Sequence, residues 1–162
     1  MIQTINQELI DQLIETAKAS PRKRTNHNFH QTYDENPHRF LNVMLRGSYF
    51  TPHRHLVPPK YESFLVLQGE VGFVEFDDEG NITTTHLLSE DGMKGIDNKV
   101  LAVDIPPGVW HCLVVMSDYA VCYEVKPGPY DPNADKEFAE WAPHEGSEGC
   151  EAYLQQLAKN FE

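Results

Sequence analysis

The sequence predicts an all-β protein, a single jelly-roll barrel with a helix before it and a helical tail after it. Short strand-like runs follow one another between residues 39 and 126, and turns rich in glycine or proline separate them. The chain has 162 residues, of which 40% are hydrophobic, which is enough for one core. We therefore expect one domain: residues 1–38 form a helix and an arm over the pocket, 39–126 the barrel, and 127–162 a tail packed on the barrel.

The N-terminal helix is expected over residues 4–19. Apolar residues recur there at helical spacing, at Ile5, Leu9, Ile10, Leu13, Ile14 and Ala17. Thr4 and Gln7 fit a capping box at its start. Ser20-Pro21 ends the helix, because a proline disfavours the helical conformation in the residue before it.

The barrel strands are expected wherever a short apolar or alternating run is bounded by turn residues. These runs are residues 40–50 (one strand or two short ones), 51–56, 62–67, 71–76, 82–88, 100–105, 110–115 and 119–125. Residues 57–60 form a loop, since two consecutive prolines cannot pair in a central strand. Residues 77–81 read as a hairpin turn and 89–98 as a loop. The proline-rich tail from residue 126 becomes helical at 150–161.

Composition excludes several classes of protein. The formal net charge of −12 repels phosphate backbones, so nucleic acid is not an expected partner. No apolar run reaches membrane-spanning length and the N-terminus has no signal segment, so we expect a cytoplasmic protein with no membrane partner. Cys112, Cys122 and Cys150 are an odd number without CxxC spacing, which argues against disulfides and against a cysteine zinc site.

Three histidines and one glutamate form the strongest chemical signal. His53 and His55 stand at i and i+2, so both side chains lie on the same face of a strand, about 7 Å apart. His111 comes on a later strand, and Glu62 opens the run after the prolines. Such a set predicts one divalent metal ion (Zn, Fe, Mn or Ni) with room for water or substrate. If the six residues between His55 and Glu62 displace the glutamate, the metal keeps three histidines and gains a water.

These residues resemble the two motifs of the cupin superfamily. The motif positions are met by Gly47, His53, His55, Glu62 and Gly69, and then by Pro106, Gly108 and His111. The gap before Glu62 is longer than usual, and a four-residue gap would place Lys60 at the ligand position. A closer resemblance, to WbuC-type cupin-fold metalloproteins, rests on residues 28–30, 39–42, 52–55, 59–62, 124–132, 135–138 and 141–143. It implies a cupin barrel that binds metal, in the context of bacterial O-antigen or lipopolysaccharide biosynthesis.

The polar arm before the barrel is expected to fold over its mouth. Asn28 and His30 would face the metal, and Arg24 or Arg22 would meet an anionic group on the substrate, for which a planar guanidinium is suited. The alternative for the arginines is a solvated basic turn after the helix. Lys60 is expected at the pocket rim, as a further substrate contact.

Two tyrosines have two interpretations each. Tyr49 alternates with Thr51 and His53, so its hydroxyl group would face the substrate or fill the core, and the same holds for Tyr123. With His30, these tyrosines are the candidates for proton transfer. The remaining histidines are expected to be ordinary loop or surface residues: His27, His38, His86 and His144.

The function predicted is a metal-dependent enzyme acting on a small anionic or carbohydrate-like substrate, such as a sugar nucleotide. The metal would act as a Lewis acid in an isomerisation or epimerisation. Two alternatives stay open: a non-haem iron dioxygenase, which uses the same ligand types, and a metal-bearing sugar-binding module without turnover. We also expect a homodimer, because the edges of antiparallel sheets must be paired or covered.

Overall fold

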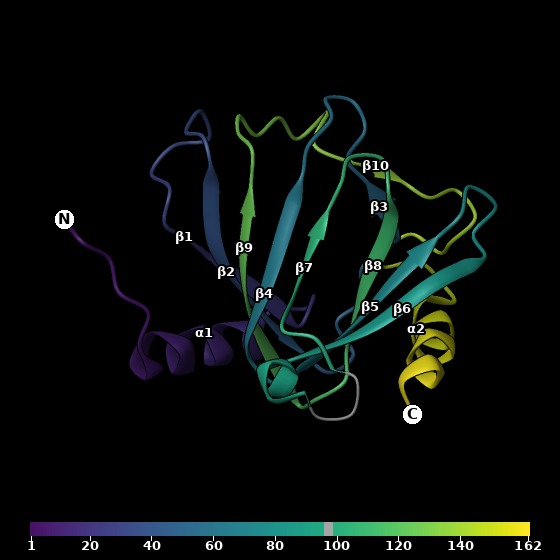
Figure 1. The fold of residues 1–162 in the computed structure, drawn as a ribbon, viewed down its shortest axis with the longest axis horizontal. Coiled ribbons are helices and arrows are strands. Elements are labelled where there is room, and N and C mark those ends of the chain that lie inside the picture. Colours follow the sequence, from purple (N-terminus) through teal and green to yellow (C-terminus); the bar gives the residue numbers. More distant parts are fainter. Residues whose placement is uncertain (96–98) are drawn as a thin grey trace.

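The chain folds into two antiparallel sheets that share one interior, with a helix near each end of the chain (Figure 1). The computed structural model describes residues 1–95 and 99–162. Its elements in chain order are α1 (Gln7–Ala19), β1 (Arg24–Asn28), β2 (His38–Leu45), β3 (His53–Arg54), β4 (Glu62–Gln68), β5 (Glu70–Phe76), β6 (Ile82–Ser89), η1 (Glu90–Lys94), β7 (Ala102–Ile105), β8 (Trp110–Val115), β9 (Tyr119–Lys126), β10 (Glu137–Phe138), α2 (Cys150–Ala158) and η2 (Lys159–Phe161). The predicted all-β jelly roll is confirmed.

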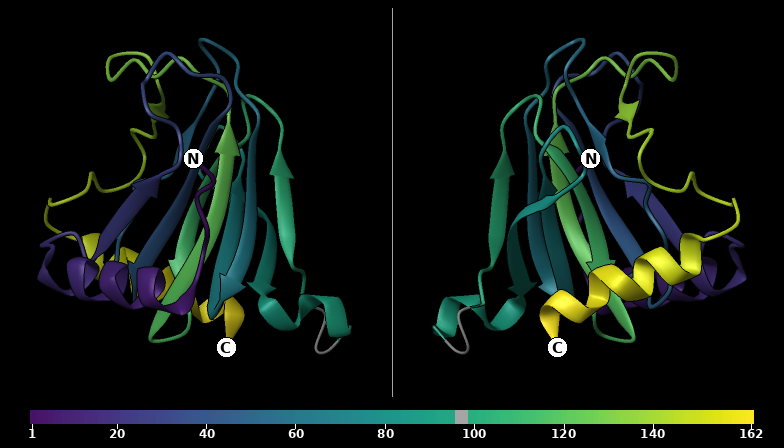
Figure 2. Two further views of the ribbon diagram at one scale, coloured as in Figure 1. Left: turned by 90° about the vertical axis from the view of Figure 1, so that its left-hand side faces the viewer. Right: turned by 90° about the vertical axis from the view of Figure 1, so that its right-hand side faces the viewer.

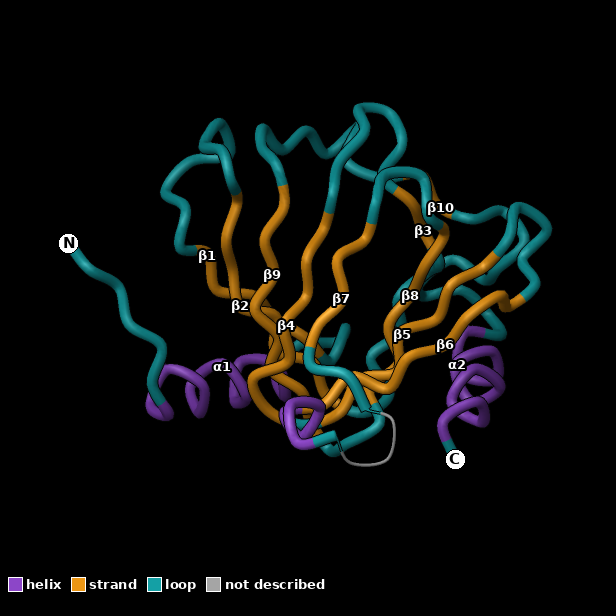
Figure 3. The backbone as a smooth tube through the Cα atoms, viewed as in Figure 1, coloured by secondary structure: helices purple, strands orange, loops and turns teal. Residues whose placement is uncertain are grey.

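The order of the strands explains how distant parts of the sequence meet. The first sheet runs β1-β2-β9-β4-β7 and the second β10-β3-β8-β5-β6. Neighbours such as β2 with β9 and β5 with β8 are far apart in the chain, so the connections cross between the sheets as in a jelly roll. Figure 3 shows the strands wrapped around the interior and the helices outside it.

The interior changes character along the strands. Its apolar part is closely packed around Met44, Val66, Val71, Phe73 and Leu88, all almost completely buried. Because alternate residues of a strand share a face, β4 turns Glu62 inward before two apolar residues, and β8 does the same with His111. Polar inward residues therefore gather at one end of the barrel.

The two helices cover the outer faces of the two sheets (Figure 2). α1 packs through the predicted apolar stripe, against side chains of β2 and β9. Its N-cap is Asn6, whose side chain accepts a hydrogen bond from the backbone N–H of Leu9 at 3.0 Å. The predicted cap at Thr4 is wrong, because the helix starts later, at Gln7. α2 packs on β5 and β8 of the second sheet through Leu157 and its neighbours.

Two of the predicted strands are much shorter than expected. The strand predicted over residues 40–50 ends at Leu45, because the chain turns at Gly47, which has a φ of +82°. The strand predicted over 51–56 is reduced to His53–Arg54.

The arm and one loop also differ from expectation. Residues 24–28 of the arm form β1, which pairs with β2 and is the edge of the first sheet. The loop predicted over 89–98 begins as η1, and its residues 96–98 lie outside the described part of the chain. Within the described ranges, no helix is long and apolar enough to cross a membrane.

Candidate metal centre and its cavity

The four predicted ligands come together at the polar end of the barrel. β3 pairs with β8 so that His53 lies opposite His111, and His55 follows directly after β3. Glu62 starts β4 in the facing sheet. One potential ligand atom from each of the four residues lies within 4.8 Å of the others, and all four residues are buried. The loop of residues 56–61 spans the long gap after His55, so the glutamate reaches the histidines after all.

The backbone fixes how the three imidazole rings point. The Nδ1 atom of His53 lies 3.1 Å from the carbonyl oxygen of Thr51, and that of His111 lies 2.9 Å from the carbonyl oxygen of Val109. The Nδ1 atom of His55 pairs with the carbonyl oxygen of Asp135. A carbonyl can only accept, so each ring carries its proton on Nδ1 and presents the lone pair of Nε2. Backbone acceptors of this kind commonly orient metal-binding histidines.

The donor set fits a cation. The Oε2 atom of Glu62 lies 3.2 Å from Nε2 of His111 and 3.3 Å from Nε2 of His55. These three atoms are acceptors when the rings carry their protons on Nδ1, and Nε2 of His55 is buried without a hydrogen-bond partner in the part of the chain described. Acceptors that converge without a donor are what a metal ion satisfies. The group of His53, His55, Glu62 and His111 could therefore bind a metal ion.

Electrostatics favour the ligand forms of these side chains. Burial, helped by the charge of Lys136, holds the pKa of His53 well below its usual value, so the ring is neutral at neutral pH. Burial would raise the pKa of Glu62, but hydrogen bonding from Glu124 and the charge of Lys126 outweigh it and hold the pKa well below its usual range. A neutral imidazole and an ionised carboxylate are the forms that bind metals.

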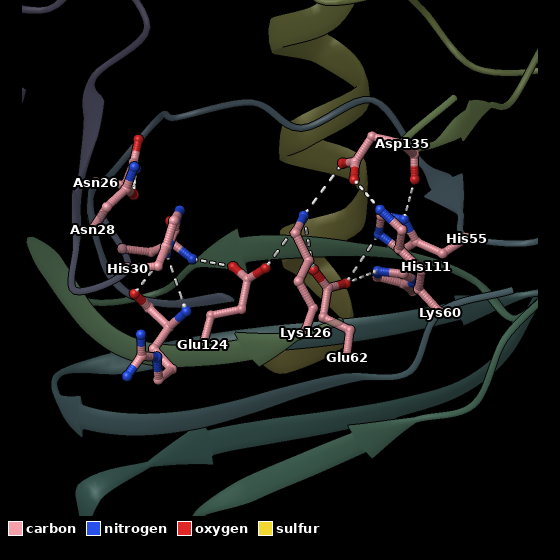
Figure 4. Close-up of polar contacts among 12 residues, drawn as sticks. Asn26, Asn28, His30, His55, Lys60, Glu62, His111, Glu124, Lys126 and Asp135 are labelled. Atoms are coloured by element: carbon pink, nitrogen blue, oxygen red, sulfur yellow. Dashed lines mark hydrogen bonds and ion pairs between the residues drawn. The ribbon is translucent and has the colours of Figure 1, made fainter. Parts of the chain in front are cut away.

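A buried network of charges surrounds the metal ligands (Figure 4). Lys126 lies 3.3 Å from Asp135, 3.6 Å from Glu124 and 3.8 Å from Glu62. Burial and the charge of Glu62 raise the pKa of Glu124 well above its usual value, and Asn42 donates a hydrogen bond to it. The tail thus supplies both a side chain to this network and the carbonyl group that orients His55 through Asp135.

Three of the four ligands, His53, Glu62 and His111, line one cavity of about 460 Å³. Its walls come from both sheets, the arm and the tail, and include the side chains of Arg22, Arg24, Asn26, Asn28, His30, His38, Asn42, His53, Glu62, His111, Glu124, Lys126, Phe138 and Glu145. Of the substrate contacts predicted from the arm, Arg22, Arg24 and Asn28 lie on this wall. Figure 4 shows Asn26, Asn28 and His30 across Glu124 and Lys126 from the metal ligands. Their role as ligand contacts stays a prediction.

The two tyrosines predicted for proton transfer do not line this cavity. The hydroxyl group of Tyr49 donates to the carbonyl oxygen of Pro143 at 2.6 Å, and its ring lies near Tyr153 of α2. The predicted alternation fails because residues 46–52 are not a strand. Tyr123 lies on the outer face of the first sheet, since the period of two turns its neighbour Glu124 inward.

The positions of Lys60 and His38 also differ from those predicted. Lys60 does not stand at the rim: it is buried, 3.1 Å from Asp135, and donates to the carbonyl oxygen of Pro129 at 2.9 Å. His38 is no surface residue but is buried on the cavity wall, stacked on His30 with ring centroids 4.1 Å apart.

Sequence reasoning missed the acidic residues of the network. The signal for Glu124 was present, since it alternates with Cys122 and Lys126 in an otherwise apolar strand. The signal for Asp135 was absent, because it lies in the tail and its partner Lys60 is distant in the chain. The same holds for Glu145, a further acidic residue on the cavity wall, which pairs with Arg24.

Comparison with known proteins identifies a family. The chain belongs to the family described as a domain of unknown function, DUF6016, whose model matches residues 5–88, just over half of the chain. No curated protein matches the chain.

Solved structures give the fold. The chain is similar to CapF, a capsular polysaccharide assembling protein from Staphylococcus aureus, with a TM-score of 0.59 and 25% identity over 75% of this chain. It spans only 33% of the CapF chain. Protein SO0799 from Shewanella oneidensis (TM-score 0.57, 11% identity, 83% of this chain and 85% of that one) and TT1209 from Thermus thermophilus (TM-score 0.53, 19% identity, 78% and 98%) share the fold alone. With the two facing sheets and the histidine–glutamate group in place, the chain is a cupin-fold protein.

Proposed function

We propose that this protein is a metal-dependent enzyme that binds a small carbohydrate carrying an anionic group and isomerises or epimerises it. The observation that carries the proposal is the acceptor-only group of three histidine Nε2 atoms and Glu62, which opens on a cavity of about 460 Å³. The cavity is of ordinary ligand size, and polar side chains line it on several sides.

The metal ligands in this proposal are His53, His55, Glu62 and His111. A divalent ion held by these residues would supply Lewis acidity towards an oxygen atom of the substrate. The chain's own residues fix the ligand orientation, through the three backbone carbonyl groups that hold Nδ1. Zn, Fe, Mn and Ni remain the candidate ions, since the donor set suits each of them.

Substrate orientation is assigned to the side of the cavity formed by the arm. The amide groups of Asn26, Asn28 and Asn42 can exchange hydrogen bonds with sugar hydroxyl groups, and Arg24 meets the anionic group. Of the three residues predicted to transfer protons, His30 alone lines the cavity, so we assign this step to it.

The likeness to CapF supports a carbohydrate substrate. That protein is named for capsular polysaccharide assembly, and 25% identity connects it with this chain over one third of its length. The WbuC-type motifs point to the same context, bacterial surface-polysaccharide biosynthesis. Substrate class and pathway context are both part of the proposal.

A substrate screen tests the proposal. Metal-loaded protein, purified without an affinity tag, is screened by thermal shift against nucleotide sugars and sugar phosphates, and ligands that raise Tm are then incubated with it. We expect a product of the same mass as the substrate and no oxygen consumption. His30→Ala should lose turnover, whereas His27→Ala, three residues earlier on β1 and not on the cavity wall, should keep it. Oxygen consumption would show a dioxygenase, and tight binding without product would show a binding module.

We also propose a homodimer. β7 and β6 are edge strands of the two sheets, and edges in stable proteins are usually paired or covered. Light scattering at micromolar concentration measures the mass directly, and a strictly monomeric mass contradicts this proposal.

A further inference from the structure

Two arginines and one glutamate meet on the cavity wall away from the metal ligands. The Nε and Nη2 atoms of Arg22 donate to the two carboxylate oxygens of Glu145 at 2.7 and 2.8 Å. The Nη2 atom of Arg24 donates to Oε2 of the same carboxylate at 2.7 Å. All three side chains line the cavity. Two guanidinium groups thus face a single carboxylate, which leaves one positive charge uncompensated among the three.

Arg24 is oriented independently of Glu145. Its Nη1 atom donates to the carbonyl oxygen of Tyr49 at 3.0 Å and to Oγ of Ser48 at 3.2 Å. Its guanidinium group also lies over the ring of Phe50, 4.2 Å from the centroid. Only Nη2 is directed at the glutamate. If Glu145 moved away, this fork would stay in place, ready for another oxyanion.

Glu145 reaches the arginines from the other edge of the barrel. β1 is one edge strand of the first sheet, and β10 is one edge strand of the second. The segment that joins β10 to α2 runs past β1 (Figure 2), and its backbone is attached where the N–H of Glu145 donates to Oγ1 of Thr51 at 2.8 Å. The ion pair therefore closes the mouth between the two sheet edges. Partial burial alone would raise the pKa of Glu145, but the two arginines hold it at about 2, so the pair persists across the neutral range.

We propose that Arg22 and Arg24 form an oxyanion subsite, that Glu145 occupies it as an internal carboxylate when no ligand is bound, and that the carboxylate or phosphate of the substrate displaces it. This inference rests on the proposed function for its ligand, a sugar that bears an anionic group. The glutamate acts as a latch, because a ligand must break its pairing with the arginines to seat its own charge. Neutral sugars cannot replace it.

Calorimetric titration of variants tests the latch. Glucose 1-phosphate, glucuronate and glucose are titrated into metal-loaded wild-type protein and Glu145→Gln. We expect the variant to bind one of the two anionic sugars about tenfold more tightly, since the competing carboxylate is gone, and the anion that gains identifies the class. Glucose should show no gain. Adding Arg24→Ala to the variant should abolish it.

The matched control is Glu137→Gln. Glu137 lies in the same tail and forms a similar two-bond ion pair with Arg54, at 2.9 and 3.0 Å, but does not line the cavity. It should bind like the wild type. If Glu145→Gln gains no more affinity for either anion than Glu137→Gln does, the latch is overturned. The metal content of each sample is measured as well. If the protein fails to retain metal but Glu145→Gln still shows the gain in affinity, the proposed metal-dependent function is refuted and the oxyanion subsite is supported.

A measurement on wild-type protein covers the case in which the variant does not fold. Hydrogen exchange of residues 143–149 is followed with and without the anionic sugars at saturating concentration. Displacement of the glutamate should speed exchange there, because the N–H bond to Thr51 loosens. Glucose should leave it unchanged. Unchanged or slower exchange with both anions overturns the latch.

Discussion

The apolar half and the polar half of the barrel interior are formed by the same strands but have different roles. On β4, Glu62 lies in the polar half, and Phe64 lies in the apolar half on the same face. On β9, Glu124 and Lys126 lie in the polar half, and Ala120 and Cys122 lie in the apolar half on the same face. The apolar half repeats what any jelly-roll core needs. The polar half holds buried charges, which are costly to desolvate and are retained where a ligand requires them.

The apolar half mainly stabilises the fold, and the polar half mainly forms the site. In the apolar half, each side chain contributes by the area it removes from water. In the polar half, groups are held in place by partners, several of which come from the tail, as Asp135 does. Changes in the first half should therefore cost stability and spare metal binding, and changes in the second half should do more to the site.

The largest loss of stability is expected in the apolar half. Leu88 is fully buried between the sheets, so Leu88→Ala should lower the free energy of unfolding by about 2–5 kcal/mol. Urea denaturation of the metal-free protein measures this. The variant that remains folded should still bind metal. A loss of metal without a loss of stability would contradict the division.

Asp135→Ala should come next. It leaves the buried ammonium groups of Lys60 and Lys126 without their shared carboxylate, at a cost of about 3 kcal/mol. The metal should also be held less firmly, since the chain at this residue orients His55. Asp131→Ala, in the same tail but exposed, is the control and should change neither unfolding nor metal affinity. Equal effects of the two variants would mean that the network carries no special role.

Glu62→Gln should act mainly on the metal. An amide is a poorer ligand than a carboxylate, so we expect the metal dissociation constant to rise about 10–100-fold. Competition with a chelator measures it. Glu79→Gln, in an exposed turn, serves as the control and should leave the constant unchanged. An unchanged constant in Glu62→Gln would give the carboxylate a structural role only.

The smallest effect concerns pH. Pairing with two arginines lowers the pKa of Glu145 from 4.5 to about 2 in the folded chain. A carboxyl group whose pKa is lowered on folding stabilises the folded state at every pH above its pKa in the unfolded chain. This contribution is lost as pH falls from 4.5 towards 2. Wild-type protein should therefore lose more stability over that interval than Glu145→Gln, as followed by Tm. Parallel curves would show that the pairing does not stabilise the folded state.

The fold and the metal ligands could be predicted from the sequence, because both follow local patterns of residues. Period-two alternation and turn residues located most strands, and the spacing of His53, His55 and His111 predicted their common site. The prediction from alternation failed for Tyr49, because the chain is not a strand there. It failed for Tyr123 because the neighbouring residue, Glu124, faces inward, which turns Tyr123 outward. Contacts between the tail and the barrel could not be predicted, since nothing local links Asp135 to His55 or Glu145 to Arg24.

We expect one metal ion to bind where the four predicted ligands converge. A crystal structure of protein loaded with a single divalent metal, with anomalous data collected at its absorption edge, tests it most directly. We predict one anomalous peak per chain, about 2.1 Å from the Nε2 atoms of His53, His55 and His111, with a carboxylate oxygen of Glu62 beside it. Rings that point apart, or a peak bound elsewhere with these four residues left free, would contradict the claim.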